Sequence, residues 1–329
     1  MIFNNVSEVN FDSLYLNLDG FLSGVNVIAK VEGMNFAGSI KFKVAKKMLD
    51  SLEQSRRINS ETEIVESSSG NLGVALAMLC AQRGYAFTCV SDPNVTLHNL
   101  NIMQAYGAKV VMVEQGLDGG FVKNRLKVIK KMLAENDNLI WTDQYSNIAN
   151  IQAHKETTAT SILNDFPDVD YVFMGVGSSG TLVGCGEYFK EKESKAKIIA
   201  IDPDGSVLFS GKSKRRFIPG IGGSVIPKIL NTSMAYDYVT VKEVDTVKMC
   251  REMVSKRGWL IGGSTGSVLQ GLRQYAEHIP HGSTVIVIAP DIGSNYLATI
   301  YDDQWVSEMK KIVRESSKTS FALESAVAL

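Results

Sequence analysis

Residues 170–181 read Asp-Tyr-Val-Phe-Met-Gly-Val-Gly-Ser-Ser-Gly-Thr, an apolar run that leads directly into a glycine-rich turn. The run predicts a buried strand, and a helical pattern follows from Thr181 to Lys192. A turn between a strand and a helix N-terminus presents backbone N–H groups and the positive end of the helix dipole, which together bind anions. We therefore expect this turn to hold a ligand.

The turn by itself is compatible with two kinds of ligand. Its glycines form a G-x-G-x-x-G pattern, and Asp202 follows Gly180 at about the 20-residue spacing typical of dinucleotide binding. The hydroxyls of Ser178, Ser179 and Thr181 would equally suit a single phosphate monoester. A purely structural glycine turn is the third possibility, and the turn alone does not separate them.

Short β-branched runs alternate with longer helical patterns from Glu63 to Ala289. This alternation predicts βαβ units and a doubly wound, mostly parallel α/β fold. Ligands of such sheets bind beyond the carboxyl ends of the strands, so glycine turns at strand ends are the places where a site is expected. The polar tail of residues 311–329 is expected to be flexible.

Three more glycine clusters and one lysine extend the pattern. One turn, Ser67–Gly73, opens a helix, a second spans Gly262–Ser267, and Pro219–Gly223 lies in a loop. Each cluster alone could be a plain helix cap or loop. Lys41 follows Gly38 and Ser39, and one lysine together with several anion-binding turns matches an aldehyde cofactor that also carries a phosphate.

The composition argues against several classes of protein. The net charge is −1 over 329 residues, so no nucleic-acid footprint is present. No apolar run reaches the length of a membrane helix, and the N-terminus lacks a signal-peptide pattern. The four cysteines form no Cys-x-x-Cys pair, and the four histidines show no metal-ligand spacing. We expect a cytoplasmic protein that uses no metal, membrane or nucleic acid.

Taken together, these motifs resemble the fold-type II pyridoxal-phosphate enzymes, the superfamily of cysteine synthase and cystathionine β-synthase. The resemblance runs from about Lys30 to Trp305 in the order of that family. The motifs that carry it are Gly38-Ser39-Ile40-Lys41, Ser69-Gly70-Asn71, Gln144-Tyr145, Gly177-Ser178-Ser179-Gly180-Thr181 and Ser264.

The resemblance implies a role for each of these residues. Lys41 would carry pyridoxal 5′-phosphate as a Schiff base and move the Cα proton of the substrate, and Ser264 would face the pyridine nitrogen. Asn71 would lie beside the cofactor 3-hydroxyl. The phosphate would be bound by Gly177, Ser178, Ser179, Gly180 and Thr181, and the substrate by Ser68, Ser69, Gly70, Asn71 and Gln144.

Within the family, the residues resemble the synthases that join O-phospho-L-serine to L-glutamate and give N-(2-amino-2-carboxyethyl)-L-glutamate. The likeness rests on the segments Glu66–Gly73, Gly205–Val207, Pro219–Gly222 and Pro290–Leu297, and on Tyr301–Trp305. It implies a β-replacement transferase on a route to 2,3-diaminopropionate, in siderophore or antibiotic biosynthesis. The alternatives are a cysteine synthase that uses sulfide, a nicotinamide-dependent oxidoreductase and a non-catalytic relative.

A phosphorylated donor and a dicarboxylate nucleophile require cationic groups. Arg125 and Arg216 are the candidates, although each could equally belong to a solvated charged surface. Gly220 would let the backbone approach a substrate closely. Tyr145 could contact the substrate or simply pack.

The family pattern is also broken near the lysine. Phe36, Phe42 and Lys43 replace the usual proline, aspartate and arginine, which removes polar groups from the neighbourhood of Lys41. The resemblance further implies a homodimer with two subdomains. Residues 1–40 and 140–310 would form the larger one, 41–81 would lead into the smaller one, and 82–139 would be the smaller, mobile one.

Overall fold

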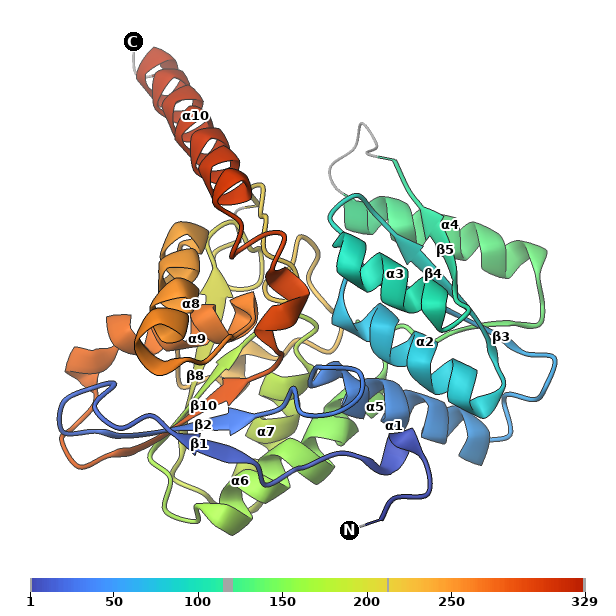
Figure 1. Ribbon diagram of the computed structural model, residues 1–329, viewed down its shortest axis with the longest axis horizontal. Coiled ribbons are helices and arrows are strands. Elements are labelled where there is room, and N and C mark those ends of the chain that lie inside the picture. The colour runs from blue at the N-terminus through green and yellow to red at the C-terminus, as the bar shows by residue number, and fades with distance from the viewer. Residues whose placement is uncertain (1, 115–120, 212, 328–329) are drawn as a thin grey trace.

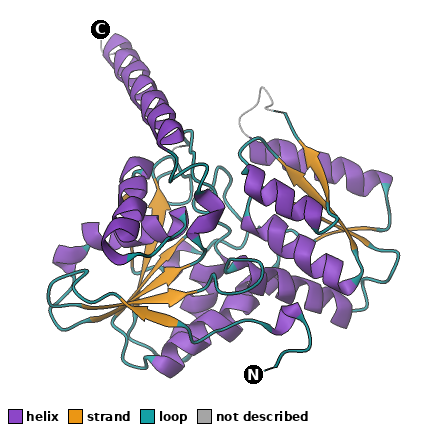
Figure 2. Cartoon of the chain, in the orientation of Figure 1, coloured by secondary structure: helices purple, strands orange, loops and turns teal. Residues whose placement is uncertain are grey.

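The computed structural model describes residues 2–114, 121–211 and 213–327, with side chains described up to residue 315. It contains two sheets that lie side by side, each flanked by helices (Figures 1 and 2). The expected fold class, α/β with doubly wound and mostly parallel sheets, is confirmed.

The larger sheet has six strands in the order β1-β2-β10-β7-β8-β9. Its edge strand β1 pairs antiparallel with β2, and all the other pairs are parallel. The strands are β1 (Tyr15–Asn17), β2 (Asn26–Val31), β7 (Tyr171–Gly175), β8 (Lys197–Pro203), β9 (Asp237–Val241) and β10 (Thr284–Ala289).

The smaller sheet has four parallel strands in the order β5-β4-β3-β6. The strands are β3 (Glu63–Ser67), β4 (Ala86–Ser91), β5 (Lys109–Met112) and β6 (Leu139–Trp141). This sheet therefore includes β3, from the segment expected to lead into the smaller subdomain, and β6, at the limit of residues 82–139. The division into a larger and a mobile subdomain stays a prediction.

Helices connect the parallel strands and cover both sheets (Figure 2). They are α1 (Lys41–Gln54), α2 (Asn71–Arg83), α3 (Leu97–Ala105), α4 (Phe121–Glu135), α5 (Ile148–Ala153), the π-helical segment His154–Ala159, α6 (Thr160–Asp165), α7 (Gly180–Glu191), α8 (Glu243–Arg257), α9 (Gly263–Gln274) and α10 (Asp303–Val327). Short 3-10 turns span Val6–Glu8, Thr232–Met234, Ala276–His278 and Gly293–Tyr296.

The strands of the larger sheet are buried on both faces. In β10, Val285 and Val287 pack into one apolar cluster, whereas Ile286 and Ile288 pack into the cluster on the opposite face. Because both faces are covered by helices, this strand reads as a continuous apolar run, and this is why the sequence pattern predicts it. Strand β2 lies beside it but is missed by the pattern, since Lys30 interrupts the run.

Helix α10 projects away from the body of the molecule and ends at the C-terminus in Figure 1. It includes most of the tail expected to be flexible, up to Val327, while residues 328 and 329 lie outside the described part. Whether this helix moves stays a prediction. Within the described residues, no helix has the length and apolar character needed to cross a membrane.

Candidate active site

Four loops meet where the carboxyl ends of both sheets face each other. The turns after β7 and β3 open α7 and α2, the segment after β2 leads into α1, and the segment after β10 follows Ala289. The loop before α1 is fixed to the end of β10, because Ile40 N–H donates to the carbonyl of Pro290 at 2.7 Å. These connections place Lys41, at the first position of α1, opposite the turn after β7.

The amine of Lys41 lies at this turn. Its Nζ donates to Ser178 Oγ at 3.1 Å, a contact between residues 137 positions apart. Burial lowers the pKa of Lys41 to about 8, although the charge of Glu66 raises it in part. A lysine with this pKa is partly neutral near pH 7, so it can act both as a nucleophile and as a proton acceptor.

The turn after β7 forms a cradle for an anion. Ser179 has a left-handed backbone, with φ of +76°, and precedes the first residue of α7. Its Oγ is buried and has no hydrogen-bond partner among the described residues. A Cβ at Gly177 would come within 3.1 Å of the carbonyl of Gly220, so a larger residue would fill the space. Free donors at a helix N-terminus make this turn suitable for a phosphate group.

A cavity joins the lysine to this cradle and to the loops on its other side. It is lined by Ile40, Lys41, Met174, Gly175, Gly177, Ser178, Ser179, Thr181, Gly220, Ile221, Ser264, Ile288 and Pro290. Seven residues that the sequence predicts for the site therefore line one cavity. Ser264 and Gly220 lie together across it, since a Cβ at Gly220 would be 3.2 Å from Ser264 Oγ.

Asn71 is held by the end of β10. Its Nδ2 donates to Asp291 Oδ2 at 2.9 Å, and the hydroxyl of Tyr296 donates to the same oxygen. Burial raises the pKa of Asp291 to about 6, although both hydrogen bonds favour the carboxylate. This contact connects the smaller sheet to the larger one. The sequence analysis assigns no role to Asp291.

The serine turn before α2 forms a helix cap. Ser68 Oγ accepts from the backbone N–H of Gly70 at 3.2 Å and of Gly73 at 3.0 Å. Ser69 and Gly70 are half-buried at the start of the helix. Ser68 therefore has the plain capping role considered for this turn, whereas Ser69 and Gly70 are its more accessible residues.

Gln144 and Tyr145 follow β6 beside a buried carboxylate. Glu66 accepts from the backbone N–H of Gln144 at 3.1 Å and from Thr142 Oγ1 at 2.6 Å, and its side chain is fully buried. Gln144 Nε2 donates to the carbonyl of Ser67 at 3.1 Å. Burial raises the pKa of Tyr145, whereas the charges of Arg125 and Arg216 lower it in part.

Neither arginine belongs to a solvated surface. Arg125 on α4 is 4 % exposed, its Nη1 forms an ion pair of 3.3 Å with Asp92, and its Nε has no hydrogen-bond partner in the described part of the chain. Arg216 is half-buried, and its Nη1 donates to the carbonyl of Ile221 at 2.7 Å. Neither arginine is among the residues that line the cavity at Lys41.

Two buried residues beside the cradle are missed by the sequence analysis. Asn150 Nδ2 donates to Ser178 Oγ at 3.0 Å, and His154 Nε2 lies 3.2 Å from Thr181 Oγ1. They are four positions apart and so lie on one face of the helix. A Cβ at Gly180 would overlap the side chain of Asn150, and one at Gly184 would lie 2.9 Å from His154 Cβ. The two glycines therefore let α7 pack closely against both residues.

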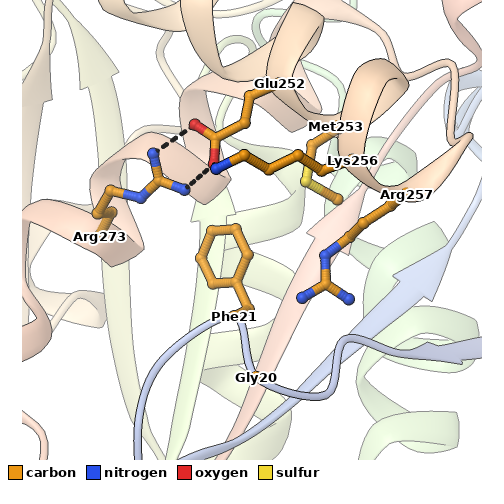
Figure 3. A pocket seen from close by; sticks show the side chains of 7 residues that line it. All are labelled: Gly20, Phe21, Glu252, Met253, Lys256, Arg257 and Arg273. Carbon is orange, nitrogen blue, oxygen red and sulfur yellow. Dashed lines mark hydrogen bonds and ion pairs between the residues drawn. The ribbon is translucent and has the colours of Figure 1, made fainter.

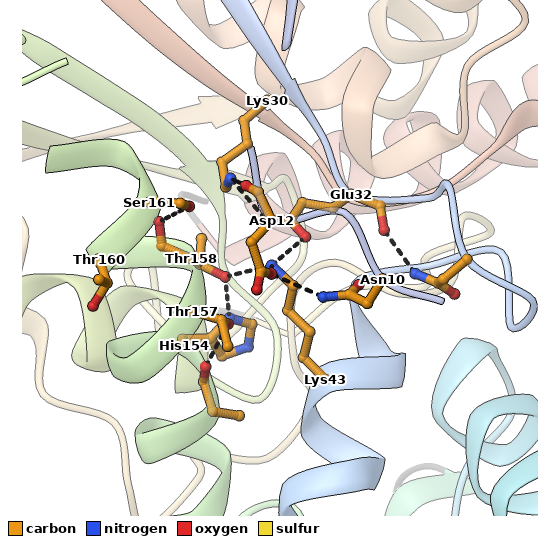
Figure 4. A network of polar contacts seen from close by, with 12 residues as sticks. Asn10, Asp12, Lys30, Glu32, Lys43, His154, Thr157, Thr158, Thr160 and Ser161 are labelled. Atoms are coloured by element: carbon orange, nitrogen blue, oxygen red, sulfur yellow. Dashed lines mark hydrogen bonds and ion pairs between the residues drawn. The ribbon is translucent and has the colours of Figure 1, made fainter. Parts of the chain in front are cut away.

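The three departures near the lysine have separate environments. Phe42 is 1 % exposed and packs in the apolar cluster between α1 and α2, whereas Phe36 is 59 % exposed. The ammonium of Lys43 forms ion pairs of 2.7 Å with both Asp12 and Glu32 (Figure 4). The polar neighbourhood lost beside Lys41 is thus replaced by apolar packing, while Lys43 acts elsewhere.

A second cleft, of about 750 Å³, lies between α8, α9 and the loop at Gly20 (Figure 3). None of the residues predicted for the site lines it. Arg273 makes two hydrogen bonds to Glu252, at 2.8 and 2.9 Å, and Lys256 makes one at 3.1 Å. Glu252 is the one carboxylate among the lining residues, whereas Lys256, Arg257 and Arg273 are cations, and Arg257 donates to the carbonyl of Asp19 at 2.7 Å.

Comparison with known proteins gives one family. The sequence model of the family described as "Pyridoxal-phosphate dependent enzyme" matches residues 14–291. Among solved structures, a lysine-to-alanine mutant of O-ureido-L-serine synthase with O-ureido-L-serine bound has a TM-score of 0.86 at 30 % identity, over 94 % of this chain and 99 % of that chain.

Two further structures are similar over nearly their full length. A hydrogen sulfide-producing enzyme from Fusobacterium nucleatum has a TM-score of 0.85 at 29 % identity, over 90 % of this chain and 100 % of that chain. An O-acetylserine-dependent cystathionine β-synthase from Helicobacter pylori has a TM-score of 0.85 at 25 % identity, over 91 % and 98 % of the two chains.

Proposed function

The chain belongs to the pyridoxal-phosphate-dependent enzymes of fold type II, in the cysteine synthase and cystathionine β-synthase family, and from this premise we propose that it replaces the phosphate of O-phospho-L-serine by the amine of L-glutamate. The coarser activity, β-replacement on an activated serine, follows the family. The observation that carries the proposal is the buried guanidinium group of Arg125, whose Nε has no hydrogen-bond partner among the described residues.

The residues of the site fit the cofactor. Ser179 supplies a buried hydroxyl without a partner, and Gly177 leaves room that a Cβ would fill. We propose that the turn 177–181 holds the phosphate, that Ser264 faces the pyridine nitrogen and that Asn71 lies beside the 3-hydroxyl. When bound, the cofactor supplies an electron sink for negative charge at the substrate Cα.

The dinucleotide alternative is wrong, since the family model identifies a pyridoxal-phosphate enzyme. The structure gives the reason for the misleading spacing. Asp202 is 1 % exposed, and its Oδ2 accepts from the backbone N–H of Phe209 at 3.3 Å. It therefore closes the loop after β8, where a ribose-binding carboxylate would have to reach a ligand.

In the proposed reaction Lys41 moves the Cα proton. Its amine, free of the cofactor once the donor is bound, takes the proton from Cα while phosphate leaves Cβ. After the amine of L-glutamate has formed its bond to Cβ, the same Nζ returns the proton to Cα. The lowered pKa of Lys41 supports this role, because an amine protonated at pH 7 could not accept the proton.

The donor carboxylate would be bound by the serine turn and by Gln144. Ser69, Gly70 and Asn71 open α2, where backbone N–H groups and the helix dipole favour a negative group. Gln144 uses one of its two amide protons for the carbonyl of Ser67 and keeps the other for the substrate. Gly220, with φ of +90°, lets the facing loop approach closely.

The nucleophile is the finer part of the proposal. L-Glutamate brings two carboxylates, and Arg125 Nε is buried without a hydrogen-bond partner among the described residues, while its Nη1 is paired with Asp92 at 3.3 Å. Leaving such a donor unpaired is costly, so a ligand carboxylate that accepts from it gains free energy. Hydrosulfide has no carboxylate and so forms no such pair of charge-assisted hydrogen bonds with a guanidinium group. We propose that Tyr145 contacts the same ligand.

The experiment offers both nucleophiles to one enzyme. Purified protein loaded with pyridoxal 5′-phosphate receives O-phospho-L-serine with equal concentrations of L-glutamate and sulfide, and the products are identified by mass. We expect the glutamate adduct to dominate, and Arg125→Gln to lower its yield far more than that of cysteine. Cysteine as the main product would overturn the proposed nucleophile, and no product from any serine derivative would support a non-catalytic relative.

We also propose that the enzyme is a cytoplasmic homodimer with a mobile subdomain of residues 82–139. Support for the dimer comes from Met34, Phe36 and Leu297, whose side chains are 54 %, 59 % and 56 % exposed. Exposed apolar side chains of this size are typical of interfaces. Light scattering coupled to size exclusion measures the mass, and a monomer would contradict the proposal.

A further inference from the structure

A buried chain of polar groups connects the N-terminal strands to the turn after β7. It runs from Glu32 and Asp12 through Lys43, Thr158 and His154 to Thr181, one of the residues that line the cavity (Figure 4 shows the first five). Glu32, Lys43, His154 and Thr158 are all less than 5 % exposed. The proposed reaction uses none of these four residues.

The contacts of the chain are continuous. Lys43 Nζ lies 3.5 Å from Thr158 Oγ1, Thr158 Oγ1 lies 3.2 Å from His154 Nδ1, and His154 Nε2 lies 3.2 Å from Thr181 Oγ1. The first contact is the longest, and there the full charge of the ammonium acts on the oxygen. Burial lowers the pKa of His154 well below its usual value, so the ring is neutral and carries one proton.

The direction of the hydrogen bonds follows from counting protons. An ammonium has three protons and no acceptor, so Thr158 Oγ1 must accept from Lys43. Thr158 then has one proton of its own, and among the described residues the other polar contact of its hydroxyl is His154 Nδ1. If Nδ1 accepts, the proton of the neutral ring lies on Nε2, and Nε2 donates to Thr181 Oγ1.

The opposite direction leaves groups unsatisfied. With the ring proton on Nδ1, Thr158 would accept twice and its own buried proton would have no partner. Thr181 would then donate to Nε2 and present a lone pair to the cavity. A lone pair repels a phosphate oxygen, whereas a hydroxyl proton binds it.

We propose that Lys43, acting through Thr158 and His154, fixes the direction of the Thr181 hydroxyl, so that its proton points at the phosphate held by this turn. The proposal rests on the proposed function only in taking the bound anion to be the cofactor phosphate. Lys43, Thr158 and His154 are positioning residues, because they act on the phosphate through Thr181. The changed residue at position 43 thereby acquires a role at the cavity.

Two members of this chain of polar groups, His154 and Thr158, lie in the π-helical segment between α5 and α6, and their side chains are in contact at a spacing of four residues. Wider turns of this kind are rare and are frequently found at functional sites. Gly184 allows α7 to approach this segment, so that Thr181 reaches the ring.

The test compares pyridoxal 5′-phosphate with pyridoxal, which lacks the phosphate. The affinity of cofactor-free protein for each is measured by absorbance, without any turnover. We expect Thr158→Val to weaken binding of pyridoxal 5′-phosphate by about 10- to 100-fold, the effect of one hydrogen bond to a charged group, and to leave pyridoxal within about twofold. Thr158→Ser, which keeps the hydroxyl, should bind both like the wild type.

Two controls separate this role from a structural one. In a Thr181→Val background, Thr158→Val should cause no further loss, because the hydroxyl it acts through is gone. In the wild type, nitrogen NMR of the imidazole should find the His154 proton on Nε2. A proton on Nδ1, or equal losses for pyridoxal and its phosphate, would overturn the proposal while the proposed function stands. Wild-type protein that binds no pyridoxal 5′-phosphate would overturn both.

Discussion

Lys41 and Lys43 lie two positions apart on the first turn of α1, yet they lie in opposite electrostatic environments. Lys41 faces the cavity, where the polar contact of its Nζ among the described residues is the hydroxyl of Ser178, and burial lowers its pKa to about 8. Lys43 faces the larger sheet, where Glu32 and Asp12 outweigh burial and raise its pKa.

The difference shows that burial alone does not decide the charge of a lysine. A buried ammonium without a carboxylate loses its proton easily, while one with two carboxylates is held charged. Because successive residues of a helix point in different directions, one turn can present a reactive amine to one side and a fixed cation to the other. Sequence position says little about either environment.

The largest effect is expected when Lys41 is removed. Lys41→Ala should lower the rate of product formation by about 10²- to 10⁴-fold or more, because the proton acceptor is lost. It should also abolish the visible band of the lysine-bound cofactor. Lys46→Ala, an exposed lysine of the same helix, is the matched control and should retain the rate. A Lys41→Ala protein with an unchanged band would refute the assignment.

The second effect concerns stability and the other lysine. Lys43→Met removes the 2.7 Å ion pair of Glu32, whose side chain is 1 % exposed, and leaves it only the longer pair with Lys30 at 3.7 Å. Removing one partner of a buried ion pair costs about 3–5 kcal/mol, so the free energy of unfolding in urea should fall by that amount. Lys47→Met breaks the exposed pair with Glu156 and should cost less than about 1 kcal/mol. Equal losses would contradict the comparison.

A third prediction concerns Asp291, a buried carboxyl group without a cationic partner among the described residues, and the pH dependence of its contribution to stability. The pKa of Asp291 is raised by burial to about 6, so the folded protein holds this proton more tightly than the unfolded chain, in which the pKa is about 3.9. Its contribution to stability is therefore full below about pH 4 and is lost as the pH rises through 6.

Replacing Asp291 by Asn removes this pH dependence. The free energy of unfolding of Asp291→Asn, minus that of the wild type, should rise by up to about 3 kcal/mol between pH 4 and pH 8. Urea unfolding at several pH values measures the difference, and groups that titrate in both proteins cancel. A difference that stays flat over this range would show that Asp291 remains ionised throughout.

The smallest effect is expected in the cleft of Figure 3. Glu252 has three hydrogen bonds to cations, and these lower its pKa to about 2, but its side chain and that of Arg273 are 28 % and 38 % exposed. Solvent screening limits such pairs, so Glu252→Gln should lower the free energy of unfolding by less than about 1 kcal/mol. A loss as large as that for Lys43→Met would mean that exposure does not separate the two clusters.

The sequence predicts the parts of the site that are local. Strand–turn–helix patterns predict the cradle at 177–181 and the turn at Ser69, and both lie at the carboxyl ends of strands. Asp291 and Asn150 are missed because their partners lie far along the chain, 220 positions for Asp291 and 28 for Asn150. When the hydrogen-bond partner of a buried polar residue lies in a distant segment, no local pattern in the sequence indicates that partner.

Some spacing does carry a signal that could have been used. His154 follows Asn150 by four positions, and Gly184 follows Gly180 by four, so two polar side chains and two glycines share facing helix surfaces. Such a pairing predicts two closely packed helices with buried polar contacts. Asp202 is the opposite case, in which a spacing is misleading. Its distance from Gly180 along the sequence fits a residue that contacts a ligand, but its side chain accepts a hydrogen bond from the loop after β8 instead.

The order of the strands also bears on how the chain is made. The smaller sheet uses one continuous stretch, from Glu63 to Trp141, whereas β2 at residues 26–31 pairs with β10 at residues 284–289. During synthesis, the smaller sheet can close while the ribosome is still translating the rest. Strand β2, with its buried Lys30, cannot pair with β10 until nearly the whole chain has been synthesised. The larger sheet therefore contains the first strands to be made but is the second sheet to be completed.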